Sequence, residues 1–418
     1  MLYLWQYIKL NWIKGIKIMF FLKKIGCRIY QSAFRIALPL LPYREPKIIQ
    51  SCNDFLRIFR DEKITAVLIV ADEGIVRNQL TSLIEAQLKS SKIDYIIYDK
   101  TQPNPTVDNV EEGVALYNQN KCDAIIAIGG GSSIDCAKAI GARIVYPKRT
   151  LNQLGGKLKI WKRLPTLIAV PTTAGTGSEV TVAALVTDTA SHKKYALMSF
   201  PLIPHYAVLD ASLTYSLPPH LTATTGMDAL THAVEAYIGR STTKRTRALA
   251  LEATKMIFEN IEIAYADGRN HIARENMLVA SYKAGIAFSM SYVGYIHAIS
   301  HSISARYSTP HGLANAVIMP YVLEGYGKSA YKKLYRLGIA AGVCGERDTY
   351  ENGAKKFIQA IKGLNEKMNI PNALDGIKEA DISELAKHAE KEANPLYPVP
   401  RLMGTDELKG FYYKIQKK

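Results

Sequence analysis

Residues 123–145 read DAIIAIGGGSSIDCAKAIGARIV and decide how the chain folds. The run AIIAI is short, apolar and rich in β-branched side chains, as in a strand that is covered on both faces. Three glycines follow it, and the pattern then changes to the spacing of a helix. A strand, a glycine-rich turn and a helix in this order predict a βα unit, the building block of a parallel sheet.

Three further apolar runs of the same kind flank this unit: AVLIVAD at 66–72, IDYIIYD at 93–99 and TLIAVPTTAGTGSE at 166–179. Helix-like stretches separate the runs from one another. Strands that alternate with helices predict right-handed crossovers within one parallel sheet.

A domain boundary is expected at YSLPP, residues 215–219. Beyond this point strand patterns disappear, and helical patterns continue to the end of the chain. The two prolines stand where a helix would begin, a position that tolerates proline. We therefore expect an N-terminal extension, an α/β domain with a parallel sheet, and an all-helical domain, over residues 1–43, 44–215 and 216–418.

The composition is that of a folded chain with a strongly basic start. Of the 418 residues 48% are hydrophobic, and the five cysteines are scattered, with no CxxC pair. This usage predicts a reduced, cytoplasmic chain without a disulfide framework. The net charge of +16 is uneven, because residues 1–44 contain eight Lys or Arg and no acid. The residues after position 44 have only a modest excess of positive charge, which argues against nucleic-acid binding.

The extension has the pattern of a basic amphipathic helix. Trp5, Ile8, Trp12, Ile16 and Met19 recur at helical spacing. Lysines interrupt each apolar run well short of the ~20 residues that span a bilayer, and no small-residue cleavage site follows. Two interpretations stay open: a helix that packs on the body or on a second subunit, and a helix that lies on an anionic membrane surface.

Three motifs carry candidate metal ligands. DALTH contains Asp228 and His232, HAISH contains His297 and His301, and TPHG contains His311. Residues four apart in a helix share a face, because one turn takes about 3.6 residues. One carboxylate and three imidazoles can enclose a divalent transition metal and leave one position open, as catalytic sites do. The three motifs thus predict a catalytic metal.

The glycine turn predicts a diphosphate site. Backbone N–H groups at the end of a strand approach phosphate oxygens closely, and the positive end of the next helix faces them. Ser132 adds a hydroxyl, while Thr172, Thr173 and Thr176 follow the next strand, at the sheet edge where ligands bind. The usual GxGxxG fingerprint is absent. Asp72 closes the first strand and favours NAD over NADP, because it would repel a 2′-phosphate; a simple turn aspartate is the alternative.

At these motifs the chain resembles the iron-containing (group III) alcohol dehydrogenases. The matching runs are GGGSSID at 129–135, PTTAGTGSEVT at 171–181, ATTGMDALTHAVEAY at 223–237, and AGIAFSMSYVGYIHAISHSISARYSTPHGLANAVIMP at 284–320. The resemblance extends from about residue 45 to the end. It implies a Rossmann-like NAD-binding domain, an all-α metal-binding domain and a homodimer.

The resemblance also implies a role for each site residue. The metal ligands would be Asp228, His232, His297 and His311, whereas His301 would lie beside the nicotinamide. The cofactor would contact residues at the ends of several strands: Asp72, Asn104, Gly130, Gly131, Ser132, Thr172, Thr173, Thr176 and Lys194. Fe²⁺ is the expected metal and Zn²⁺ the alternative, since three nitrogens and one oxygen suit both. All five metal-site positions are intact, which speaks against an inactive scaffold.

The predicted activity is reversible hydride transfer between NAD(H) and a primary alcohol or aldehyde bound at the metal. His301 would relay a proton or position the nicotinamide. Two rivals remain. A hydroxyacid dehydrogenase or transhydrogenase of the same family would need a cation in the cleft, for which Arg306 is a candidate. An NAD- and metal-dependent lyase resembling dehydroquinate synthase would need several cations, and the ligand-bearing segments are mostly apolar or small.

Overall fold

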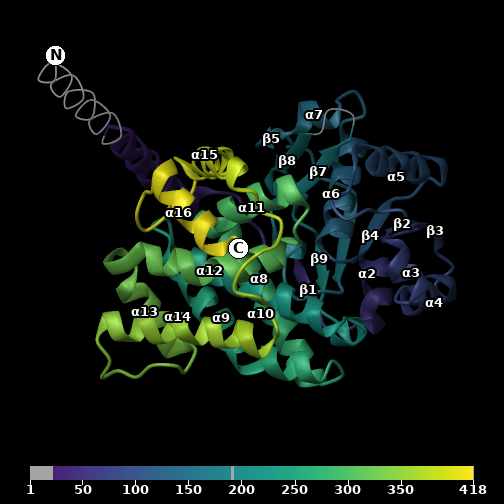
Figure 1. Ribbon diagram of the computed structural model, residues 1–418. Coiled ribbons are helices and arrows are strands. Elements are labelled where there is room, and N and C mark those ends of the chain that lie inside the picture. The colour runs from purple at the N-terminus through teal and green to yellow at the C-terminus, as the bar shows by residue number, and fades with distance from the viewer. Residues whose placement is uncertain (1–21, 190–192, 418) are drawn as a thin grey trace, which may run out of the picture.

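The structure is a computed structural model that describes residues 22–189 and 193–417. The strands gather in one half of the molecule and the long helices in the other (Figure 1). This arrangement confirms the predicted fold class, an α/β part with a parallel sheet followed by a helical part. We retain the division at residues 215 and 216 as a proposal.

Six parallel strands form the main sheet. In spatial order they are β1 (Lys47–Ile49), β9 (Tyr206–Val208), β6 (Thr166–Pro171), β4 (Ala124–Gly129), β2 (Ala66–Val70) and β3 (Asp94–Tyr98). The four predicted strands are the four on the β3 side. Gly129 at the end of β4 pairs with Pro171 at the end of β6. The glycine turn, residues 129–131, and the threonine loop, residues 172–177, therefore leave the sheet side by side.

Helices cover both faces of this sheet, which is why its central strands are apolar throughout. Leu68 and Val70 of β2 pack with side chains of α5 and α6, whereas Val67 and Ile69 pack with those of α2 and α4. The helices of this half are α2 (Phe55–Asp61), α3 (Glu73–Arg77), α4 (Ser82–Ser90), α5 (Val107–Gln119), α6 (Gly131–Val145) and α7 (Leu151–Leu154).

A second sheet, which the sequence patterns did not reveal, lies beside α6. Its order is β5 (Gly156–Lys157), β8 (Lys193–Met198) and β7 (Ala183–Asp188), and β7 and β8 are antiparallel. The backbone N–H of Thr187 in β7 donates to the carbonyl of Pro105, at 2.8 Å. The hairpin of β7 and β8 therefore lies against the loop that precedes α5.

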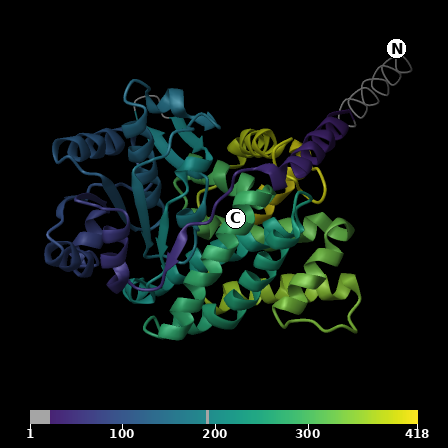
Figure 2. The same cartoon turned by 180° about the vertical axis from the view of Figure 1, so that it is seen from behind.

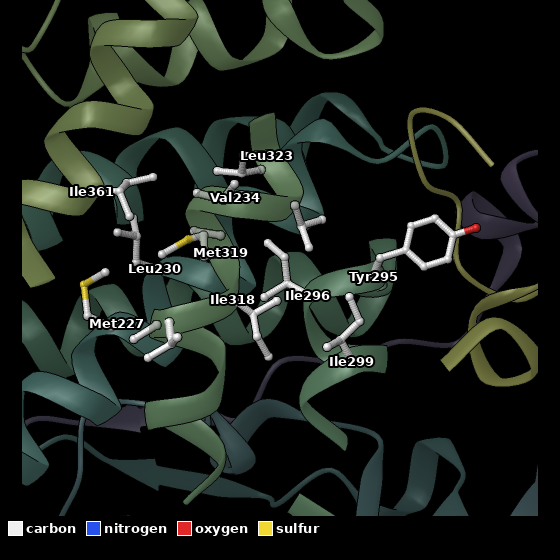
Figure 3. Packing of buried hydrophobic residues seen from close by; sticks show 14 of the residues in the cluster. Met227, Leu230, Val234, Tyr295, Ile296, Ile299, Ile318, Met319, Leu323 and Ile361 are labelled. Atoms are coloured by element: carbon white, nitrogen blue, oxygen red, sulfur yellow. The ribbon is translucent and has the colours of Figure 1, made fainter. Parts of the chain in front are cut away.

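The second half is built from helices around a large apolar core. They are α8 (Pro219–Ile238), α9 (Lys244–Ala266), α10 (His271–Ser291), α11 (Tyr295–Tyr307), α12 (His311–Tyr326), α13 (Tyr331–Ala340), α14 (Tyr350–Lys367), α15 (Ile382–Ala393) and α16 (Thr405–Ile415). As expected, the YSLPP prolines begin the first of them, with Pro219 as its first residue. Figure 3 shows Leu230 of α8, Ile299 of α11 and Met319 of α12 in this core.

Ahead of the sheet, residues 22–37 form a helix that leads into the short turn η1 (Leu38–Leu40). Figure 2 shows this purple helix beside the yellow C-terminal helices. The predicted stripe from Trp5 to Met19 lies outside the described residues. Among those that are described, no helix combines the length and the apolarity needed to cross a bilayer.

The two halves are in close contact at a pair of glycines. Gly177, in the threonine loop, has a left-handed φ of 61°, and Gly285 lies within α10. A Cβ added to Gly285 would lie 2.5 Å from Cγ2 of Val180 and 3.1 Å from Cα of Gly177. The backbone of α10 therefore contacts the loop directly, and nothing larger than glycine fits.

Replacing Gly285 should weaken the contact between the two halves. Gly285→Ala is expected to lower the free energy of unfolding by about 1–3 kcal/mol, because the new methyl group overlaps packed atoms. Gly363→Ala is the matched control, since it adds the same methyl group to α14, where nothing lies within 4 Å, and should be neutral or stabilising by up to about 1 kcal/mol. Urea unfolding measures both, and equal stabilities of the two variants would contradict the close approach.

Candidate metal and cofactor site

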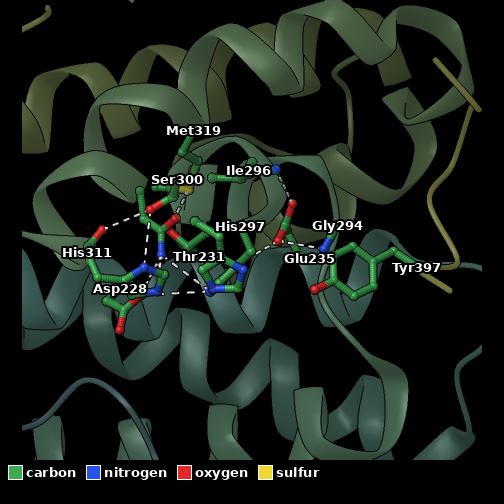
Figure 4. Close-up of polar contacts among 12 residues, drawn as sticks. Asp228, Thr231, Glu235, Gly294, Ile296, His297, Ser300, His311, Met319 and Tyr397 are labelled. Carbon is green, nitrogen blue, oxygen red and sulfur yellow. Dashed lines mark hydrogen bonds and ion pairs between the residues drawn. The ribbon is translucent and has the colours of Figure 1, made fainter. Parts of the chain in front are cut away.

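Three side chains from three helices converge on one point (Figure 4). Asp228 comes from α8, His297 from α11 and His311 from the first turn of α12. Asp228 Oδ1 lies 3.9 Å from His297 Nε2 and 3.5 Å from His311 Nε2. One ligand atom from each residue falls within 4.8 Å of the others, so together they could coordinate a single ion. Asp228 and His297 are buried, whereas His311 is partly exposed.

Asn315, one turn after His311 in α12, marks the centre of this group. Its amide Nδ2 lies 2.7 Å from Asp228 Oδ1, 3.0 Å from His311 Nε2 and 3.3 Å from His297 Nε2. An amide NH₂ has two hydrogens for these three neighbours. In a neutral His297 whose Nδ1–H donates to the Glu235 carboxylate, Nε2 is the acceptor. A lone pair on Nε2 is also what a metal requires of a histidine. Asn315 was not among the predicted site residues, although its spacing of four from His311 was a usable signal.

Glu235 fixes the orientation of His297. The Glu235 carboxylate accepts hydrogen bonds from His297 Nδ1 at 2.7 Å, from the backbone N–H of Gly294 at 2.7 Å, and from that of Ile296 at 2.8 Å. Burial raises the pKa of Glu235 to about 7, against the effect of these donors. Histidines that bind metals commonly donate their other ring N–H to a carboxylate in this way. Glu235 was also missed, although it lies seven residues after Asp228 and thus on the same face of α8.

His232 lies against this group. Its ring stacks on Phe288, with centroids 4.0 Å apart, and on His297, with centroids 4.6 Å apart. Its Nδ1 is buried and has no hydrogen-bond partner within the described part of the chain. A buried ring nitrogen without a partner is costly unless a ligand satisfies it. His232 is not among the residues whose ligand atoms lie within 4.8 Å of one another, however, so the structure brings together three of the four predicted ligands and places the fourth beside them.

His301 occupies a separate position, one turn after His297 in α11. Its ring stacks on that of His311, with centroids 5.1 Å apart, and its Nδ1 lies 2.6 Å from Oε1 of Glu392 in α15. Tyr397 donates a second hydrogen bond to the same oxygen, at 2.7 Å. Burial lowers the pKa of His301, but the charge and hydrogen bond of Glu392 outweigh it and raise the pKa above its usual value. No sequence signal connected Glu392 to this histidine.

The predicted cofactor residues meet where the central strands end. The carbonyl of Gly129 accepts the backbone N–H of Thr172 at 3.0 Å. A Cβ on Gly130 would lie 3.6 Å from the side chain of Thr173, and one on Gly131 only 2.8 Å from that of Thr176. The glycine turn and the threonine loop are therefore in contact and form one surface.

Two further loops border this surface. The backbone N–H of Asn104 donates to Oγ of Ser132, at 3.3 Å. Asp72 caps α3 by accepting the backbone N–H of Ile75 at 3.0 Å, and a Cβ on Gly129 would lie 3.6 Å from its Oδ2. Asp72 is therefore a turn aspartate that caps a helix, as the alternative interpretation of this residue expected. Its carboxylate also borders the glycine turn.

Lys194 is the one predicted cofactor residue whose side chain lies outside the described structure. Its backbone pairs with Thr187 across β7 and β8. Because Thr187 contacts the loop before α5, Lys194 belongs to the hairpin that lies next to Asn104.

A buried lysine joins the glycine turn, the threonine loop and the hairpin. Lys138 of α6 donates to Oγ of Ser178 at 3.2 Å, to Oγ1 of Thr181 at 2.8 Å and to the carbonyl of Ala183 at 2.8 Å. Asp135, one turn earlier, accepts from Oγ of Ser178 at 2.5 Å. Burial lowers the pKa of Lys138 to about 8, opposed by the charge of Asp135. The network fixes the threonine loop relative to the helix that begins at the glycine turn.

Arg306, the candidate cation for an acidic substrate, has another partner. Its Nε lies 3.2 Å from Oδ2 of Asp381, and more than half of its side chain is exposed. Tyr307 donates to the same oxygen at 2.7 Å. Arg306 is therefore a surface ion pair and does not supply a free positive charge beside the histidines.

Comparison with known proteins places both halves of the chain in one family. The model of iron-containing alcohol dehydrogenases matches residues 47–211, and the model of the C-terminal part of the Fe-containing alcohol dehydrogenase family matches residues 222–415. Together the two matches span most of the chain and both groups of site residues.

Individual proteins agree. A 1,3-propanediol dehydrogenase of Klebsiella pneumoniae is 36% identical over 368 residues, which cover 86% of this chain and 93% of the relative. An NAD-dependent methanol dehydrogenase of Bacillus methanolicus is 38% identical over 327 residues, 77% of this chain and 85% of the relative. The crystal structure of a 1,3-propanediol oxidoreductase superposes with a TM-score of 0.86 at 33% identity, covering 89% of this chain and 99% of the other.

Removal of the buried lysine should disturb the cofactor loops. Lys138→Met leaves the largely buried Asp135 carboxylate without its cation and removes the hydrogen bonds of Lys138, which is expected to lower the free energy of unfolding by about 3 kcal/mol. NADH binding should weaken as well, because the threonine loop loses its anchor. Lys162→Met, at an exposed lysine, is the control, and fluorescence titration with NADH measures the binding. Unchanged stability and unchanged NADH affinity in Lys138→Met would show that the network does not position the loop.

Proposed function

The chain belongs to the iron-containing alcohol dehydrogenase family and is a metal-dependent alcohol dehydrogenase with an NAD-type cofactor, and from this premise we propose its metal ligands, its cofactor and the roles of its histidines. The reaction is reversible hydride transfer between NAD(H) and a primary alcohol or aldehyde. The observation that carries the proposal is the convergence of Asp228, His297 and His311 on one point.

Four residues bind the metal: Asp228, His232, His297 and His311. Asp228 Oδ1 and the Nε2 atoms of His297 and His311 lie around the amide of Asn315. His232, whose ring stacks on that of His297, is the proposed fourth ligand. A divalent metal bound here supplies a Lewis acid for the alcohol or aldehyde oxygen. Fe²⁺ is the metal that we propose, with Zn²⁺ as the alternative, because three nitrogens and one oxygen accommodate either.

NAD is the proposed cofactor. The contact between the glycine turn and the threonine loop supports a diphosphate site there, with backbone N–H groups near the start of α6. Asp72 borders the glycine turn with a carboxylate that favours a ribose hydroxyl over a phosphate. The residues proposed to contact NAD are Asp72, Asn104, Gly130, Gly131, Ser132, Thr172, Thr173, Thr176 and Lys194.

His301 handles the proton or positions the nicotinamide ring. Glu392 accepts a hydrogen bond from its Nδ1, which leaves Nε2 as the nitrogen that faces away from that carboxylate. A histidine stabilised by a carboxylate can exchange a proton with a neighbouring hydroxyl group. Its stacking on His311 keeps it beside the proposed metal without making it a ligand.

The alternatives lack support in the structure. A hydroxyacid substrate calls for a free cation, and Arg306 is paired with Asp381. A lyase acting on a phosphorylated acid would need several cations near the ligands, where α11 offers mainly apolar and small side chains. A homodimer is the proposed assembly, on the ground of family membership alone.

The activity is tested by the absorbance of NADH. Anaerobic protein loaded with Fe²⁺ or Zn²⁺ is mixed with NAD or NADP and a series of short primary alcohols, with and without a chelator. We expect a rise in absorbance that the chelator abolishes, because the metal activates the alcohol oxygen, and that is faster with NAD than with NADP. A rise that persists in the chelator would refute the metal-dependent mechanism, and a preference for NADP would refute the role of Asp72.

Substitutions of Glu235 and Glu392, the two carboxylates that each bond to one histidine, should have different effects. Glu235→Gln is expected to lower the affinity for Fe²⁺ or Zn²⁺ by about 10- to 100-fold, because it weakens the support of His297. Glu392→Gln is the matched control: it weakens the support of His301, so metal content should be retained while turnover falls and its pH profile shifts. Metal analysis after gel filtration measures the first effect and steady-state kinetics the second. Equal metal loss in both variants would contradict the division between ligand and proton-handling histidines.

A further inference from the structure

Helix 22–37 is attached to the body through polar and small side chains and through one aromatic ring, since Phe34 packs on Tyr292 with ring centroids 4.9 Å apart. Cys27 and Gln31 are buried, and Gln31 Nε2 donates to the carbonyls of Pro395 and Tyr397 at 3.1 and 2.8 Å. Arg28 donates to the carbonyl of Val399 at 2.8 Å. These residues occupy one face of the helix, because they follow one another at intervals of about one turn.

The opposite face exposes large aliphatic side chains. Leu22, Ile25, Ile29 and Ile36 recur at intervals of three, four and seven, which places them in one stripe. Leu22, Ile29 and Ile36 are 61%, 65% and 76% exposed. Leu40, just beyond the helix, extends the stripe and is exposed too. Helices that pack on a protein body normally bury their apolar residues, whereas this helix leaves a strip of large aliphatic side chains at the surface.

A basic pocket opens at the same helix. Arg35, Arg240 and Lys333 line a pocket of about 370 Å³ together with Ile238, Ser329 and Pro400. Lys333 Nζ donates to the carbonyl of Ile238 at 3.0 Å. Burial lowers the pKa of Lys333 to about 8, and the charges of Arg247, Arg240 and Arg35 lower it further. Within residues 22–189 and 193–417, no carboxylate forms an ion pair with any of the three lining cations, so the pocket concentrates uncompensated positive charge.

We propose that the exposed stripe of helix 22–37 and the pocket of Arg35, Arg240 and Lys333 form one docking surface for an anionic phospholipid bilayer. The stripe enters the boundary between head groups and acyl chains, as apolar faces of surface helices do. The cationic pocket receives a phosphate of the head-group layer, where basic residues are attracted to the negative surface.

Charge distinguishes this partner from a second copy of the chain. Residues 1–44 contain eight Lys or Arg and no acid. Two such extensions placed face to face would bring like charges together, which is unfavourable, whereas an anionic bilayer neutralises them. The proposal does not depend on the metal site, because none of the residues of this surface is a proposed ligand or a cofactor contact.

Co-sedimentation with vesicles tests the proposal on the full chain. Vesicles of phosphatidylcholine with about one third phosphatidylglycerol are compared with vesicles of phosphatidylcholine alone. We expect binding to the anionic vesicles that added salt weakens, and little binding to the neutral ones. Ile29→Ser combined with Ile36→Ser should weaken the binding about tenfold or more. Ile263→Ser combined with Ile272→Ser is the matched control, since both isoleucines are exposed on other helices and their loss should change nothing.

A second pair of variants tests the pocket. Arg35→Gln combined with Arg240→Gln should weaken binding to anionic vesicles about fivefold for each removed charge. Arg57→Gln combined with Lys121→Gln removes two exposed charges elsewhere and is the control. NADH-linked activity confirms that each variant is folded.

Three results would overturn the proposal. The first is wild-type protein that binds neutral and anionic vesicles equally or binds neither. The second is a loss of binding that is the same in the test and control variants. The third is a change of oligomeric mass by light scattering in Ile29→Ser/Ile36→Ser without a change in vesicle binding, which would assign the stripe to contact between subunits.

Discussion

The candidate metal site depends on one buried carboxylate, Glu235. It connects α8 to the start of α11, because it accepts the first free backbone N–H groups of α11 as well as the ring of His297. A negative charge at a helix N-terminus is favourable, since the unpaired N–H groups there carry partial positive charge. The same contact therefore begins the helix, orients its first histidine and sets which ring nitrogen faces Asp228.

The cofactor surface rests on a different principle, the close approach of backbone to backbone. The ends of β4 and β6 are level, so the turns that follow them must share one space. Glycines at 130 and 131 leave room for the threonines of the neighbouring loop, and Gly177 lets the same loop contact α10. Lys138 then ties that loop to α6 through buried hydrogen bonds. A hydride donor and acceptor can face each other only if both halves hold these positions.

Sequence patterns predicted those elements and residues whose signal lies within one short stretch of sequence. The strands β2, β3, β4 and β6 are continuous apolar runs because helices cover both sheet faces, and Asp228, His297 and His311 stand in short motifs. By contrast, β1 and β9 are too short to show a pattern, and β7 mixes exposed and buried positions. Glu235 and Glu392 were missed because each meets its histidine across 62 and 91 positions of the chain. Such contacts arise from packing between helices, which periodicity does not report.

The attachment of helix 22–37 gives the active site a connection to the outside of the molecule. Gln31 donates to the carbonyl of Tyr397, the hydroxyl of Tyr397 donates to Glu392, and Glu392 accepts from His301. Any displacement of the helix would act on Tyr397, and with it on the carboxylate that sets the proton affinity of His301. Coupling of this kind is reciprocal. If a ligand at the active site shifts Tyr397, the free energy with which helix 22–37 binds to the body changes by the same amount. Three hydrogen bonds thus separate the surface helix from His301, and the attachment of the helix and the support of this histidine share one residue, Tyr397.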